Sequence, residues 1–472
     1  MNNTNTPSID RNRRAIGMMI LGAMLCLSTT YAQEKISIDA DFSRLTAKRT
    51  RTIGIGVNFL SDSPEIGGRL RDLHVGCIRY ATTEYTRFQP DSPETFGVAI
   101  RDQSLWPVQK FTDTKKWYSK LSFDQFMTLC RNANAEPCVV LPIDAMIYTG
   151  KADADSADDV VQAATDWVRY ANVTKKYNVR HWEIGNESDI VTNPNVKWTP
   201  ESYAEATIRL SKAMKSVDPT IKVGVNGMRM GQTLPWWDEL LPKVAGHIDF
   251  LVTHQYSWLP SYENWRTDPS RYDYNVTDAA TALKKHKLQV PILVTEVSGF
   301  NPAAKQPNCA WKALHSFEVI GNVLSHSEVE SAIFWTSKWL GKNDASEDVN
   351  ALTDDNQISA MGQTLAIWCQ HGQGDVAQCP DRSGVRAWFC RKKDGTMSLF
   401  VLNKGSHAVA VTLNISGTEG RFSVNNAAKY TSTSPSAVRL SNSPLKVTEE
   451  SADQLKLGLP PLTLGIVNGK VR

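Results

Sequence analysis

Between residues 53 and 369, short apolar runs rich in β-branched residues alternate with longer segments that have helical periodicity. Eight runs have the length of strands: Ile53–Phe59, Gly76–Tyr80, Cys138–Ile143, His181–Ile184, Lys222–Val225, Phe250–Thr253, Ile292–Thr295 and Ser331–Trp335. Helical segments lie between them, for example Ser122–Asn132, Ala154–Tyr177, Pro200–Val217 and Trp311–Ser325. Because neighbouring parallel strands need a crossover connection, this alternation predicts a parallel sheet, and eight strands predict a closed (β/α)8 TIM barrel. A doubly wound open sheet is the alternative.

After Cys369 the pattern changes to short alternating strands separated by turns rich in Gly, Asn and Ser, which is typical of an antiparallel β-sandwich. The expected strands are Val385–Arg391, Met397–Val401, Ala408–Ile415, Arg421–Val424, Leu445–Thr448 and Leu462–Val467. The segment Lys35–Ala40 (KISIDA) alternates in the same way. We therefore expect a catalytic barrel over residues 53–369 and a sandwich over 370–472, with residues 33–52 contributing a strand to the sandwich.

The N-terminus has the pattern of a signal peptide. Its charged region holds three basic residues, Arg11, Arg13 and Arg14. An apolar run from Ala15 to Leu27 follows, and small residues precede a cleavage point after Ala32. A lipid anchor on Cys26 is less favoured, because the two residues before it are not small. We expect cleavage of residues 1–32 and export to the periplasm or the outside, and no later segment predicts a membrane span.

Composition excludes several classes of partner. The net charge of +3 is small for 472 residues, so nothing points to nucleic acid. Neither a zinc-type cysteine spacing nor a phosphate-binding glycine loop is present, so we expect no cofactor and no metal. Removal of the signal peptide leaves an odd number of cysteines, and a disulfide is conceivable among Cys369, Cys379 and Cys390. The sequence contains no signal for an oligomeric state.

The ends of two predicted strands carry glutamates. In a (β/α)8 barrel, catalytic groups lie at the C-terminal ends of the strands. Strand four ends HWEIGNES and presents Asn186 and Glu187, whereas strand seven ends ILVTEVS and presents Glu296. Two carboxyl groups about 5–5.5 Å apart support retaining glycoside hydrolysis, in which one donates a proton and the other attacks the anomeric carbon. Glu183, inside strand four, is expected to be a structural partner.

Other strand ends supply groups that suit a sugar site. Strand six ends THQYSW and presents His254 and Tyr256, and strand two ends IRYATTEY and presents Arg79. A tyrosine hydroxyl can hold the nucleophile ionised and oriented. Because Tyr256 and Arg79 should stabilise negative charge on Glu296, we expect Glu187 to be the partner that keeps its proton.

Together these residues resemble clan A glycoside hydrolases. In that clan the Glu of an Asn-Glu pair after strand four is the acid/base, and a Glu at the end of strand seven is the nucleophile. The resemblance therefore implies that Glu187 is the acid/base, that Glu296 is the nucleophile, and that Asn186 binds the sugar 2-hydroxyl. The closing run LPPLTLGIV (459–467) is similar to the last sandwich strand of families 30, 39, 51 and 79.

The resemblance also covers the supporting residues. It matches Arg79 to the strand-two arginine of the clan, His254 and Tyr256 to its strand-six pair, and Trp335 to the tryptophan beneath the sugar. The long loops after strands two and six match no single family, so the resemblance implies the mechanism of the clan and leaves the substrate open.

Several loop residues are candidates for substrate binding. Trp258 and Trp265 lie in the loop after strand six and could stack on sugar rings, although packing of the loop is the alternative. Arg79, Arg229 and Lys338 are cations near strand ends and would suit an anionic sugar. Pairing of these cations with carboxylates is the favoured interpretation.

The leading hypothesis is a secreted, retaining hydrolase of a plant or algal oligo- or polysaccharide, acting on a β-linked glycan or an α-L-arabinofuranoside by an exo or an endo mode. A non-catalytic glycan-binding protein and a transglycosylase that uses the same residues are the alternatives. Two other interpretations compete for the site residues. Glu187 and Glu296 could be structural carboxylates, or they could form a metal site with His254.

Overall fold

The computed structural model describes residues 34–46, 50–57, 63–80, 86–87, 97–98, 121–141, 143, 157–190, 192–193, 196–228, 236–299, 308–338, 349–451 and 453–471. The predicted signal peptide and Arg229 lie outside the described residues. Most of the long segment after strand two lies outside them as well.

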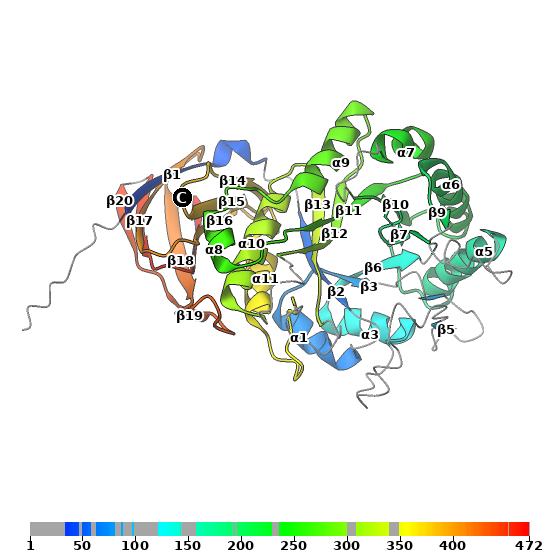
Figure 1. Ribbon diagram of the computed structural model, residues 1–472, viewed down its shortest axis with the longest axis horizontal. Coiled ribbons are helices and arrows are strands. Elements are labelled where there is room, and N and C mark those ends of the chain that lie inside the picture. Colours follow the sequence, from blue (N-terminus) through cyan, green and yellow to red (C-terminus); the bar gives the residue numbers. More distant parts are fainter. Residues whose placement is uncertain are drawn as a thin grey trace, which may run out of the picture. The chain divides into compact units, whose positions relative to one another are not determined.

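Eight parallel strands form a closed barrel in this part of the chain (Figure 1). In chain order they are β2 (Thr52–Val57), β3 (Cys77–Tyr80), β6 (Glu136–Leu141), β7 (His181–Ile184), β10 (Lys222–Asn226), β11 (Phe250–Tyr256), β12 (Ile292–Ser298) and β13 (Val329–Phe334). Each strand pairs in parallel with the next, and β13 closes the barrel on β2. The barrel prediction is confirmed, and the open-sheet alternative is wrong.

Helices connect the strands, as the parallel pairing requires. The described helices of the barrel are α1 (Gly67–Asp72), α3 (Phe123–Ala133), α5 (Ala157–Val168), α6 (Pro200–Val217), α7 (Trp236–Val244), α8 (Tyr262–Thr267), α9 (Tyr274–Lys285), α10 (Ala310–Leu324) and α11 (Ala360–His371). The predicted start of α6 at Pro200 is confirmed, because Thr199 and Ser202 form a capping box ahead of a proline at the first helical position. Within the described residues, no helix combines the length and the apolar character that a membrane span requires.

The C-terminal strands form two sheets. One sheet has the order β1-β17-β21-β20 and the other β14-β15-β16-β22-β18-β19. Their bounds are β1 (Glu34–Asp41), β14 (Asp375–Gln378), β15 (Val385–Arg391), β16 (Thr396–Asn403), β17 (Val409–Ser416), β18 (Phe422–Thr431), β19 (Ser441–Pro444), β20 (Val447–Ser451), β21 (Gln454–Leu459) and β22 (Thr463–Val471). Apolar residues of both sheets share one core, as in a sandwich, and β1 lies parallel to β17.

Among the residues that the structure describes, the cysteines form no disulfide. All seven cysteines in the described residues are free and buried. Cys379 packs in the core between the two sheets, whereas Cys369 and Cys390 pack in the larger core of the barrel. Cys379 is thus separated from the other two, and Cys369 and Cys390 share a core without a bond between them, so the structure contains none of the disulfides that the sequence suggested.

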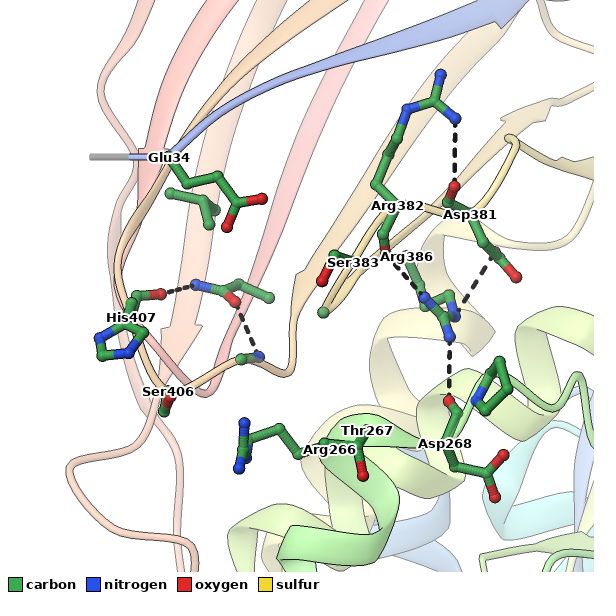
Figure 2. A pocket seen from close by; sticks show the side chains of 15 residues that line it. Glu34, Arg266, Thr267, Asp268, Asp381, Arg382, Ser383, Arg386, Ser406 and His407 are labelled. Atoms are coloured by element: carbon green, nitrogen blue, oxygen red, sulfur yellow. Dashed lines mark hydrogen bonds and ion pairs between the residues drawn. The ribbon is translucent and has the colours of Figure 1, made fainter. Parts of the chain in front are cut away.

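A buried ion cluster joins α10 to the sandwich. Glu318 has no exposed surface, and its carboxylate contacts Lys404 Nζ at 3.1 and 3.2 Å and Arg386 Nε at 3.0 Å. The Trp265 indole donates to the same carboxylate at 2.6 Å. Figure 2 shows the adjoining cavity of about 480 Å³, where Arg386 also donates to the Asp268 carbonyl oxygen at 3.2 Å. The carboxylate thus compensates two buried cations at once.

Replacement Glu318→Gln should destabilise the protein strongly. The variant leaves Lys404 buried without its counter-ion and leaves Arg386 with only the more distant Asp381 carboxylate at 3.5 Å, which costs about 3–5 kcal/mol. Urea unfolding should show this loss, whereas the control Glu263→Gln, which removes an exposed ion pair with Arg266, should cost less than about 1 kcal/mol. Equal stability of the two variants would contradict the assignment of the cluster as a structural anchor.

Candidate active site

The guanidinium of Arg79 lies at the centre of the polar groups inside the barrel mouth. Arg79 is the last residue but one of β3 and is completely buried. Its Nε and Nη2 atoms contact the two carboxylate oxygens of Glu183 at 2.9 Å each, and Nη1 donates to Glu296 Oε1 at 2.8 Å. Nη2 also donates to Asn186 Oδ1 at 2.8 Å. Burial lowers the pKa of Arg79, but the charges of Glu183 and Glu296 outweigh this effect and raise it, so the cation is permanent.

Glu296 receives a hydrogen bond on each carboxylate oxygen. Arg79 occupies Oε1, and the hydroxyl of Tyr256 donates to Oε2. Burial and the neighbouring carboxylates hold the pKa of Tyr256 well above its ordinary value, so its phenol remains a donor. The expected contacts of Arg79 and Tyr256 with Glu296 are confirmed, and they fix the orientation of the carboxylate.

A bulge at Thr295 of β12 shifts its pairing with β11 beside His254. The sequence predicted that this strand ends at Thr253, but it continues to Tyr256. The register with β12 shifts between Thr253 and His254, so that His254 pairs with Glu296. Bulges are known to re-aim side chains near active sites.

Glu187 lies in a turn of unusual backbone conformation directly after β7. Its φ angle is 54°, in the left-handed region, and Gly185 has a φ of 74°. The carboxylate oxygen Oε1 is 2.8 Å from His254 Nδ1, which is itself 3.3 Å from Glu296 Oε2. One donor atom from each of Glu187, His254 and Glu296 lies within 4.8 Å of the others.

The protonation of Glu187 differs from the prediction. Burial would raise its pKa, but the hydrogen bond and charge of His254, with the charge of Arg79, lower it below the ordinary value. For His254, burial lowers the pKa, and the carboxylates of Glu296 and Glu187 raise it by a larger amount. Both shifts favour a proton on His254 over one on Glu187, because this ring lies between two carboxylates.

Glu187, His254 and Glu296 also lie close enough together to be candidate metal ligands. Their donor atoms already bond to one another, to Arg79 and to Tyr256. The permanent cation of Arg79 beside Glu296 further disfavours a metal ion at this point. The donor set suits proton transfer and nucleophilic attack.

Two polar residues of the site were missed in the sequence. The side-chain oxygen Asn226 Oδ1, at the end of β10, accepts from the Ser188 backbone N–H at 2.7 Å. Asp189 Oδ2 accepts from the Met228 backbone N–H at 2.8 Å. The available signal was position alone: Asp189 follows Glu187 by two residues, and Asn226 ends strand five.

The remaining candidates lie in different environments. The ring of Trp335 lies against Gly56 of β2, where an added Cβ would approach it to 2.9 Å. Trp258 is 49% exposed, as a sugar platform requires. Lys338 is buried after β13. Trp265 is completely buried and bonded to Glu318, so the structure does not support its predicted role as a sugar subsite.

A barrel with these carboxylates after strands four and seven has the architecture of clan A glycoside hydrolases. Residues 100–276 match the family model described as an alpha-L-arabinofuranosidase 1 domain. A probable alpha-L-arabinofuranosidase C from Aspergillus fumigatus is 28% identical over 167 residues, which cover 33% of this chain and 30% of the fungal protein. An intracellular exo-alpha-(1->5)-L-arabinofuranosidase from Halalkalibacterium halodurans is 22% identical over 198 residues, or 40% and 37% of the two chains. The match thus spans about a third of the length of these curated relatives.

Solved structures share the fold over nearly the whole chain. A family 51 alpha-L-arabinofuranosidase from Bifidobacterium longum has a TM-score of 0.67 at 14% identity, covering 92% of this chain and 99% of that one. An alpha-L-arabinofuranosidase from Thermotoga maritima has a TM-score of 0.64 at 14% identity, covering 93% and 100%. A family 44 xyloglucanase from Paenibacillus polymyxa has a TM-score of 0.63 at 14% identity, covering 93% and 100%. These likenesses establish the fold, a TIM barrel with a C-terminal β-domain.

The stability of the protein should report the titration of Asp189. Burial raises its pKa from 3.8 to about 7, and the charge of Glu187 adds to the rise. The folded state thus binds this proton more tightly than the unfolded chain, so the stabilisation is complete below pH 3.8 and is lost as the pH rises through about 7. In Asp189→Asn, which keeps an acceptor for Met228, this loss is absent.

The measurement is urea unfolding of both proteins at a series of pH values. From about pH 4 to about pH 8, the stability of the wild type relative to Asp189→Asn should fall steadily. A difference in free energy of unfolding that does not change with pH would contradict the raised pKa.

Proposed function

We propose that the protein is an exported, retaining glycoside hydrolase that removes L-arabinofuranosyl groups from a plant or algal oligo- or polysaccharide. The observation that carries this proposal is the short separation of the Glu187 and Glu296 carboxylates, whose nearest donor atoms lie within 4.8 Å. Retaining enzymes need about 5–5.5 Å between the carboxyl groups, whereas inverting enzymes need about 6.5–9.5 Å to admit a water.

In the first step Glu296 attacks the anomeric carbon, and the bond from this carbon to the leaving oxygen breaks. Glu187 gives its proton to that oxygen, and a glycosyl ester forms on Glu296. In the second step a water attacks the anomeric carbon, Glu187 takes the water proton, and the Glu296 carboxylate leaves. Arg79 and Tyr256 stabilise the charge of Glu296 before attack and after release.

His254 supplies the proton for the first step. Nδ1 of the ring lies 2.8 Å from Glu187 Oε1, within hydrogen-bond distance. Transfer across this hydrogen bond converts Glu187 into the acid. The bond joins an acid and a base in direct contact, so the transfer needs no intervening water.

The sugar class is inferred from the comparisons and from the open part of the site. The family model covers the segment that contains Glu187, and the relatives named above act on alpha-L-arabinofuranosides by their names. The exposed ring of Trp258 offers a flat apolar face beside the strand-six residues. The signal-peptide pattern supports export of the protein to the periplasm or the outside, where it would encounter plant and algal polysaccharides.

A substrate panel tests the proposal against its alternatives. The wild type should release arabinose from 4-nitrophenyl α-L-arabinofuranoside and from arabinan, and it should leave xyloglucan and red-algal galactan intact. Binding of a glycan without any release of sugar would favour the non-catalytic alternative. Transfer of arabinose to an added acceptor in place of water would favour the transglycosylase.

Replacement Glu187→Ala should separate substrates by their leaving groups. General acid catalysis contributes about 10²–10⁴-fold to bonds with poor leaving groups. The variant should therefore lose about that much kcat/KM on methyl α-L-arabinofuranoside, and far less on the 4-nitrophenyl glycoside in the first step. Equal losses on the two substrates would exclude Glu187 as the acid/base.

A further inference from the structure

The turn that carries Glu187 is bonded to the end of β10 by two reciprocal hydrogen bonds. Asn226 Oδ1, on β10, accepts from the Ser188 N–H at 2.7 Å. In the opposite direction, Asp189 Oδ2, on the turn, accepts from the Met228 N–H at 2.8 Å. We call this pair of bonds the β10 clamp.

Asn226 is itself held rigidly. It is 2% exposed, and its Nδ2 atom donates to the Ile184 carbonyl oxygen at 2.5 Å. The Tyr203 hydroxyl donates to the same carbonyl and lies 3.1 Å from Asn226 Nδ2. The Asn226 carbonyl oxygen accepts from the Trp236 indole at 3.1 Å. A side chain fixed at all its polar atoms can transmit a precise position to the residue that it binds.

Glu187 needs such support because its backbone conformation is unfavourable. A φ of 54° is disfavoured for every residue with a Cβ atom, and it persists only where the surroundings enforce it. The two residues that follow Glu187, Ser188 and Asp189, are the two that the β10 clamp holds. A third bond, from the Ile190 N–H to the Glu187 carbonyl oxygen at 2.9 Å, closes the turn.

We propose that Asn226 and Asp189 are positioning residues for the acid/base: the β10 clamp holds Glu187 in its left-handed turn and thereby places its carboxylate against His254 Nδ1. This inference rests on the proposed function, because the role of Glu187 as acid/base is part of that function. Asn226 and Asp189 bond to backbone N–H groups in and beside the turn of Glu187, whereas Arg79 and Tyr256 hold Glu296. Loss of the clamp should therefore weaken proton donation and leave attack by Glu296 largely intact.

The test compares leaving groups in clamp variants. For Asn226→Ala and Asp189→Ala, kcat/KM on methyl α-L-arabinofuranoside should fall at least about tenfold more than on the 4-nitrophenyl glycoside, in the same sense as for Glu187→Ala. The conservative Asp189→Asn keeps an acceptor for Met228 and should restore the wild-type ratio of the two rates. The clamp variants could lose equal activity on both substrates while Glu187→Ala loses more on the methyl glycoside. That outcome would overturn the inference and leave the proposed function standing.

The control is Asn172→Ala. The Asn172 amide also binds backbone, at the Val179 N–H and carbonyl oxygen, but before β7 begins and at the opposite end of that strand from Glu187. It should lower stability without changing the ratio between the substrates. A changed ratio in this control would show that general destabilisation produces the effect, and would also overturn the inference.

A crystal structure of Asn226→Ala tests the clamp without any assay. The contact of 2.8 Å between Glu187 Oε1 and His254 Nδ1 should be lost or lengthened. An unmoved Glu187 would refute the inference even if the proposed function itself fails. If Asn226→Ala does not fold, the structure of Asp189→Ala serves the same purpose, since this residue is only partly buried.

Discussion

The buried guanidinium of Arg79 organises the mouth of the barrel. A buried cation is stable only with partners, and here Glu183 and Glu296 provide the compensating charges. Because these partners come from β7 and β12, the ion cluster ties separate strands of the barrel to one geometry. Asn186, bonded to the same guanidinium, brings the start of the turn with Glu187 into the cluster. Arg79 thus contributes to the distance between the two catalytic candidates from the side of Glu296 and from the start of the turn that carries Glu187.

Periodicity was enough to predict the strands of the barrel. All eight barrel strands and the helix over Pro200–Val217 follow from apolar runs and helical patterning. The ends of the strands were harder to predict from the sequence, because a bulge such as that beside His254 depends on pairing with a neighbouring strand. The sequence did not predict three strands of the sandwich, β14, β19 and β21. Such strands depend more on pairing with their neighbours than on the pattern of their own residues.

The site was predictable where a barrel rule applies. Carboxylates at strand ends identify Glu187 and Glu296, and the same rule selects Tyr256. The same rule does not identify Asn226, because an asparagine near the end of a strand is also typical of an ordinary loop. Aromatic residues in loops are equally ambiguous, and Trp265 serves the packing of the sandwich junction. The lowered pKa of Glu187 depends on contact with His254, which only the folded chain brings about.

We propose that Glu187 and Glu296 act as acid/base and nucleophile in a double displacement. Proton NMR of the sugar released in the first moments of hydrolysis, before its anomers equilibrate, tests this mechanism most directly. The first product should have the same anomeric configuration as the substrate, because two inversions at one carbon restore it. A first product of the opposite configuration would show a single displacement by water and would contradict the role of Glu296 as nucleophile.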